Sequence, residues 1–224
     1  MSLHRALNTI QSTLSNNQIW RVLRLAEKNG ERCGGSVVLA GLVVGIGMVE
    51  LSAGPLQQTS RFSLELLVLV VLQLVGPMLV SLLAMALLMP RWLERVERRG
   101  RGAWRESVPA AAVLGALLLL MFLVAAVCAG AVTTPRADLI GELRELMGGI
   151  LVKDVVRAML RCGMFLAMIC SWCQWRGYQE MKAGKAPGLL VSNLQIEGLM
   201  VLFTLKLIWI TVIDPIKLMG GSGQ

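Results

Sequence analysis

Apolar residues along this chain gather in five long stretches separated by short polar segments. The stretches cover residues 34–51, 64–88, 108–132, 155–175 and 189–213. A helix needs about 20 apolar residues to cross the hydrocarbon layer, where only structures that bond their own backbone groups are tolerated. The first three stretches contain only two acids, Glu50 and Glu65, each near an end. The pattern therefore predicts an all-α integral membrane protein with five transmembrane helices.

Basic residues divide the polar segments into two groups. The basic-rich group precedes the first stretch, joins the second to the third and joins the fourth to the fifth; it includes Arg5, Arg21, Arg24, Lys28, Arg32, Arg91, Arg95, Arg98, Arg99, Arg101, Arg105, Arg176, Lys182 and Lys185. The other group contains Arg61, Arg136, Arg144, Lys153 and Lys217. Because cytoplasmic loops carry the excess of Lys and Arg, we expect a cytoplasmic N-terminus and, after an odd number of spans, an external C-terminus.

Residues 1–33 have helical periodicity without the length of apolar sequence that a span needs. Apolar residues recur at helical spacing, namely Leu3, Leu7, Ile10 and Leu14. A basic face lies opposite Trp20 and Leu23, and it consists of Arg21, Arg24 and Lys28. This pattern is typical of a helix in the membrane interface, and a soluble cytoplasmic helix is the alternative. We therefore expect an interfacial helix at residues 1–33, a transmembrane domain at 34–219 and a flexible tail at 220–224.

Composition supports the membrane class and argues against other classes. The chain has 224 residues, of which 55% are hydrophobic, and a formal charge of +8. Its basic residues lie at predicted span ends, where topology and anionic lipid explain them, so nucleic acid is not an expected partner. The Cys170-x-x-Cys173 pair could suggest redox or metal chemistry, but His4 is the only histidine. We interpret the five cysteines as packing residues and expect no metal site.

Catalysis is not expected from this chain. The sequence has no Ser/His/Asp group, no cluster of metal ligands and no glycine loop that could cradle phosphates. We therefore expect a protein that is not an enzyme and has no cofactor of its own.

Glycine and proline mark expected features of the spans and loops. Gly41 and Gly45, four residues apart, predict close helix packing, either within the protein or across a dimer. Gly76-Pro77 predicts a kink in the second span. Residues 90–107 form either a short amphipathic cytoplasmic helix or a solvated charged loop, and residues 133–153 predict a short external helix.

Ionisable residues inside the spans are costly and need a partner, a cavity or water. Asp154, Arg157 and Arg161 share one face of the fourth span, and Asp154 can pair with Arg157 locally. Lys206 lies midway along the fifth span, and the acids near the outer ends of the first two spans are possible partners, namely Glu50 and Glu65. These charges either form structural ion pairs between helices or provide a polar lining for a substrate cavity.

Three stretches give the chain a resemblance to a family of membrane proteins. Residues 72–77, Leu-Gln-Leu-Val-Gly-Pro, resemble a Leu-Arg-Glu-Leu-Gly-Pro motif in the second span. Asp154 with Arg161 seven residues later, and Gly177-Tyr178 at the end of the fourth span, complete the pattern. With five spans after an N-terminal interfacial helix, the whole chain resembles the MlaE/YrbE permeases, the membrane subunits of ABC transporters that move phospholipids or related lipids together with MCE-domain proteins.

The resemblance implies a function, partners and site residues. It implies a multi-pass permease of the bacterial inner membrane that works with an ABC ATPase subunit, an MCE-domain protein and a second permease copy or paralogue. ATP and Mg would be bound by the partner ATPase. Residues implied to face the lipid are Gln73, Gly76, Pro77, Arg161 and Lys206. Residues implied to dock on the ATPase are Arg91, Arg95, Arg98 and Arg99.

The chain also departs from the family pattern. The family's Arg-Glu pair is Gln73-Leu74 here, and Lys206 occupies a position where the family is expected to have an acid. The stretch after the second span is apolar, and the following cytoplasmic loop is short. These differences predict either a divergent permease or a non-transporting scaffold or assembly subunit of a lipid-transport complex.

Overall fold

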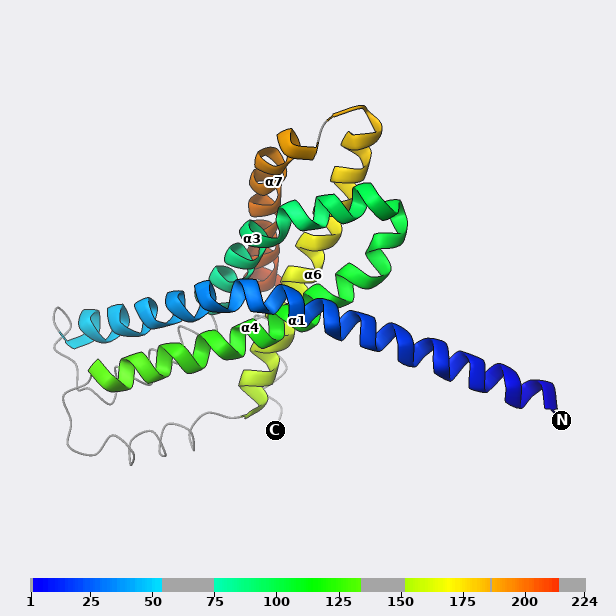
Figure 1. The fold of residues 1–224 in the computed structure, drawn as a ribbon. Helices are drawn as coiled ribbons and strands as arrows, with labels where there is room; N and C mark the ends of the chain where they lie inside the picture. Colours follow the sequence, from blue (N-terminus) through cyan, green and yellow to red (C-terminus); the bar gives the residue numbers. More distant parts are fainter. Residues whose placement is uncertain (1, 54–74, 134–151, 186, 214–224) are drawn as a thin grey trace.

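The described part of the protein is a bundle of long helices. The computed structural model describes residues 2–53, 75–133, 152–185 and 187–213 (Figure 1). Its elements are α1 (Ser2–Ala53), α3 (Gly76–Arg99), η2 (Gly100–Ala103), α4 (Trp104–Thr133), α6 (Val152–Lys182), α7 (Pro187–Ile208) and η3 (Trp209–Ile213). Within these ranges there is no strand, and five helices are long and apolar enough to cross a membrane. The predicted all-α, multi-pass membrane class is therefore confirmed at this level.

The first helix runs without a break through the boundary predicted near residue 33. Its N-terminal part extends away from the other helices, and its second half lies beside α4 (Figure 1). Trp20 and Leu23 are exposed, whereas Ala26 and Cys33 are buried against the bundle. One side of α1 therefore packs on the protein while Trp20 and Leu23 face outward. The separate interfacial helix at residues 1–33 stays a prediction, since here those residues belong to the same helix as the first span.

The segment predicted at residues 90–107 is helical and continues α3 directly. The helix α3 passes through Pro90 to Arg99, η2 makes the turn at Gly100, where φ is 57°, and α4 begins at Trp104. The solvated-loop alternative is wrong. Residues 90–99 are the last turns of α3, and one face of them is buried against the protein through Trp92 and Val96. The amphipathic-helix alternative is confirmed, as an extension of α3 rather than a separate element.

Glycines bring the helices into backbone contact. A Cβ on Gly41 of α1 would lie 2.6 Å from the carbonyl oxygen of Phe122, and one on Gly45 would overlap the carbonyl of Ala126, both on α4. The pair predicted from its spacing therefore packs within the protein. A glycine also allows α6 to pack closely on α4, because a Cβ on Gly163 would lie 2.5 Å from the carbonyl oxygen of Ala112.

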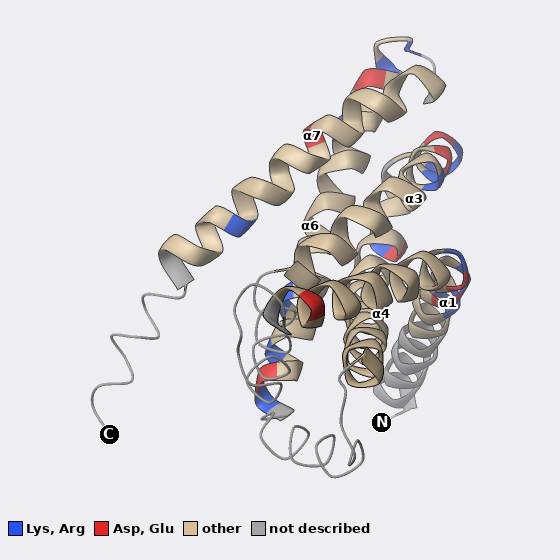
Figure 2. Cartoon of the chain, turned by 90° about the vertical axis from the view of Figure 1, so that its left-hand side faces the viewer, with Lys and Arg blue, Asp and Glu red and all other residues tan. Residues whose placement is uncertain are grey.

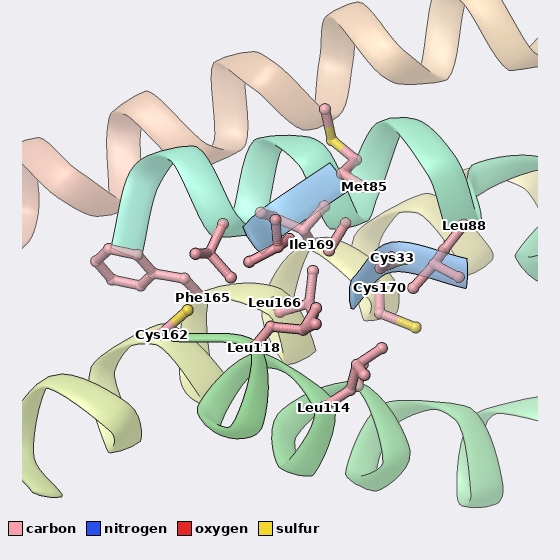
Figure 3. Packing of buried hydrophobic residues seen from close by; sticks show 14 of the residues in the cluster. Cys33, Met85, Leu88, Leu114, Leu118, Cys162, Phe165, Leu166, Ile169 and Cys170 are labelled. Carbon is pink, nitrogen blue, oxygen red and sulfur yellow. The ribbon is translucent and has the colours of Figure 1, made fainter. Parts of the chain in front are cut away.

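The core lies where α4 and α6 meet α1 and α3 (Figure 3). Among the largest fully buried side chains are Trp92, Phe122 and Phe165. Cys170 and Cys173 are fully buried, and their Sγ atoms lie 3.8 and 3.9 Å from backbone carbonyl oxygens, which agrees with a packing role. Charged residues gather at the joined ends of α3 and α4, whereas α7 carries one acid and one cation along its length (Figure 2). The predicted external helix lies mostly outside the described residues, as does the tail at 220–224.

Candidate functional site

Two cations predicted to face a lipid are buried, one on α6 against an aromatic residue and one near the end of α7. Arg161 and Lys206 are only 7% and 5% exposed. The guanidinium carbon of Arg161 lies 4.6 Å from the centre of the Trp209 ring, and Phe165 meets the same ring edge-on at 6.0 Å. Lys206 precedes Trp209 by three residues and so lies on the same side of the helix. Delocalised charge over an indole face is a favourable way to hold an arginine away from water.

Buried Gly76 and Pro77 lie beside α6. They form the first turn of α3. The Sγ atom of Cys162, the residue after Arg161, lies 3.9 Å from the Pro77 carbonyl oxygen and 3.8 Å from Ser81 Oγ. The structure therefore places Gly76-Pro77 next to the part of α6 that carries Arg161. Gln73 and the first half of the predicted second span lie outside the described residues, and so does any kink between the two halves.

The outer charges of α6 are separate from Arg161. Arg157 Nη1 donates to Asp154 Oδ1 at 3.4 Å, as the spacing predicted, and both side chains are substantially exposed. Glu50 is exposed near the end of α1, whereas Glu65 lies outside the described residues. The predicted polar face of the fourth span is therefore divided into an exposed ion pair and a buried arginine one turn deeper.

Three of the four arginines predicted to dock on an ATPase have partners within the chain. Arg91 Nη1 lies 3.4 Å from Asn29 Oδ1 of α1, Arg98 pairs with Glu94 at 2.6 Å, and Arg99 pairs with Glu106 at 2.7 Å. Arg98 and Arg99 remain largely exposed in these pairs. The fourth, Arg95, is half-buried on the inner side of the turn between α3 and α4.

Sequence reasoning missed a cluster of charges that joins α6 to α7. Arg176 donates from Nε and Nη2 to the two carboxylate oxygens of Glu197, at 3.2 and 3.4 Å. Arg176 also lies 3.6 Å from Glu180, which pairs with Lys185 at 2.5 Å. The missed signal was Glu197 itself, an acid eight residues into the fifth predicted span. It needed a cation, and Arg176 follows the preceding span directly.

Comparison with known proteins does not assign a family or a function to the chain. The chain matches no model of a known protein family and no curated protein.

Proposed function

We propose that this chain is the permease subunit of an ABC transporter that moves phospholipid or a related lipid between membranes. ATP is hydrolysed on a separate subunit, and the chain spans the bacterial inner membrane five times. The proposal is supported by the five long apolar helices and by the motif residues of the MlaE/YrbE resemblance. It is also supported by the packing of Gly76-Pro77 against the part of α6 that carries Arg161.

The observation that carries the proposal is the burial of two cations, Arg161 and Lys206, within predicted spans. Charges in the hydrocarbon region are costly and are kept mainly where they face a partner, a cavity or a transported group. In the proposed function these two cations act on the polar headgroup of the lipid as it passes, while apolar helix faces hold the acyl chains. The Trp209 ring would hold the Arg161 guanidinium in place through the contact at 4.6 Å.

A dimer and an MCE-domain protein complete the proposed transporter. Of the five long helices, α1 and α7 bury the smallest share of their apolar windows within the chain. These two helices therefore offer the most surface to a second permease copy or to lipid. The MCE-domain protein would contact the external ends of the helices, and the ATPase would contact the arginine-rich ends.

Lipid transfer by single-residue variants tests the proposal. Arg161→Ala and Lys206→Ala should each reduce transfer by at least tenfold in a reconstituted complex that still contains all its subunits. Arg157→Ala is the matched control, because Arg157 lies one turn away in an exposed pair, and it should retain transfer. The proposal fails if a complex purified repeatedly under mild conditions contains no ATPase.

The second candidate function is a scaffold or assembly subunit that does not transport. It is favoured by the arginine pairs of α3, because Arg91, Arg98 and Arg99 hold partners inside the chain. A scaffold predicts that Arg161→Ala and Lys206→Ala prevent assembly and leave no intact complex to assay. It also predicts that a reconstituted complex transfers lipid without this subunit.

A further inference from the structure

One face of α6 is exposed along most of the helix. Its exposed side chains recur every four residues, are all apolar and are between 39% and 69% exposed: Val156, Leu160, Met164, Met168 and Trp172. Every other residue of α6 from 157 to 171 is buried or half-buried, because α3, α4 and α7 pack against the rest of the helix. We call these five exposed residues the α6 row.

The two ends of the α6 row differ from its middle. At one end Asp154 and Arg157 form their exposed ion pair. At the other end Trp172 and Trp175 are 40% and 39% exposed, their ring centres lie 5.3 Å apart, and the charged Arg176 follows directly. The helix from Asp154 to Trp175 is about 30 Å long, which is the thickness of the hydrocarbon layer of a membrane.

The tryptophan pair has the chemistry of the boundary between lipid and water. Tryptophan is enriched at that boundary because its ring is apolar and its indole N–H is polar. Trp172 and Trp175 are both accessible, they touch each other, and they separate the apolar row from the charges at the end of α6. This order of apolar, aromatic and charged groups along one face indicates where α6 leaves the hydrocarbon.

The α6 row does not have the composition of a surface that packs on another helix. Membrane helices associate closely through small residues or through polar groups. Within this chain α6 uses glycine for that purpose, because a Cβ on Gly163 would lie 2.5 Å from the Ala112 carbonyl oxygen and one on Gly177 would overlap the Leu93 side chain. The row has neither small nor polar residues, and most of it consists of leucine and methionine. It therefore fits acyl chains better than a second copy of the protein.

We propose that the α6 row lies against the acyl chains of the bilayer and that Trp172 and Trp175 lie among the lipid headgroups on the arginine-rich side. The ion pair between Arg176 and Glu197 is then at the membrane boundary. Arg161 lies about 20 Å along the helix from Trp175, so it is past the middle of the hydrocarbon layer. This placement does not depend on the proposed transport, because the lipid here is the surrounding bilayer rather than the cargo.

Spin labels on α6 test what covers the row. Met164→Cys, Met168→Cys and Gln179→Cys are made one at a time in a full chain with Cys128→Ala, labelled with a nitroxide and placed in vesicles of phosphatidylethanolamine and phosphatidylglycerol. Gln179→Cys is the matched control, because Gln179 is exposed one turn beyond Trp175. The ratio of collisions with oxygen to collisions with a water-soluble nickel complex should be at least about fivefold higher at Met164 and Met168 than at Gln179.

Two results would overturn the lipid contact of the row. Few collisions with either reagent at Met164, together with dipolar broadening between labels, would show that a second copy covers it. Frequent collisions with the nickel complex at Met164 would show that the row lines a water-filled space.

Brominated lipids test the depth of the tryptophan pair. The fluorescence that is lost in Trp172→Phe/Trp175→Phe belongs to the pair, and it should be quenched about twofold more by lipid brominated near the headgroup than by lipid brominated near the end of the chain. Trp92→Phe is the control, because Trp92 is 1% exposed and its fluorescence should resist both lipids. Equal quenching of the pair by the two lipids, or none by either, would overturn its position at the headgroups.

Discussion

The side chain of Gln195 on α7 donates from Nε2 to the backbone carbonyl oxygen of Ala86 on α3, at 3.4 Å. That carbonyl is the one a helical N–H at position 90 would bond, and position 90 is a proline, which has no N–H. A neighbouring helix thus compensates for the gap that Pro90 leaves in α3. Such compensation is how membrane helices tolerate proline, because lipid cannot bond the freed carbonyl.

The hydrogen bond from Gln195 to the Ala86 carbonyl should stabilise the folded protein only while Pro90 is present. Gln195→Leu should lower the free energy of unfolding by about 1 kcal/mol, the usual size of one such bond. In a Pro90→Ala background the backbone N–H gained at position 90 bonds the Ala86 carbonyl, so the same Gln195→Leu change should have little effect. Equilibrium unfolding in mixed micelles of all four variants measures this difference. An equal loss in both backgrounds would show that Gln195 contributes through packing instead.

The close contact of α1 with α4 should not tolerate a methyl group. Gly45→Ala places its Cβ inside the carbonyl of Ala126, so the helices must separate, at a cost of about 1–3 kcal/mol. Gly47→Ala is the control on the same helix, because nothing lies within 4 Å of a Cβ there. Thermal unfolding in detergent should place Gly45→Ala well below the wild type and Gly47→Ala close to it. Equal melting temperatures for the two variants would contradict this packing.

The ion pair between Arg176 and Glu197 should fix the ends of α6 and α7 to one another. Both side chains are about one third exposed, so solvent screens the pair and its loss should destabilise the protein only slightly, despite the two hydrogen bonds. Arg176→Glu should destabilise by more, since it places two acids together. Adding Glu197→Arg should recover part of the loss. Unfolding measurements on the two single variants and the double variant test this, and a double variant as unstable as the sum of both single variants would count against the pair.

Periodicity was sufficient to predict five long apolar helices, because that feature depends on local sequence. It did not predict that the helix of residues 1–33 continues directly into the first span. The helical nature of the 90–107 segment was only one of two alternatives, since its helix is stabilised by Trp92 and Val96 packing on distant residues. Whether Gly41 and Gly45 face α4 or another molecule was likewise undecided, because spacing does not name the partner helix.

The candidate site was predictable only in part for the same reason. Ionisable residues inside apolar stretches were visible in the sequence, so Arg161 and Lys206 could be singled out. Their common neighbour Trp209 could not, because tryptophan is ordinary in a span and its role comes from Arg161 on another helix.

The predicted topology can be tested by labelling from one side of the membrane. Cys128 is the exposed native thiol among the described residues, so Cys128→Ala provides the background. A membrane-impermeant maleimide applied to intact cells should then label Val132→Cys, which is 76% exposed at the end of α4. It should label Glu97→Cys, near the turn between α3 and α4, only after the membrane is opened. The reverse pattern would invert the orientation and place the arginine-rich turn between α3 and α4 outside, because the positive-inside rule alone assigns it to the cytoplasm.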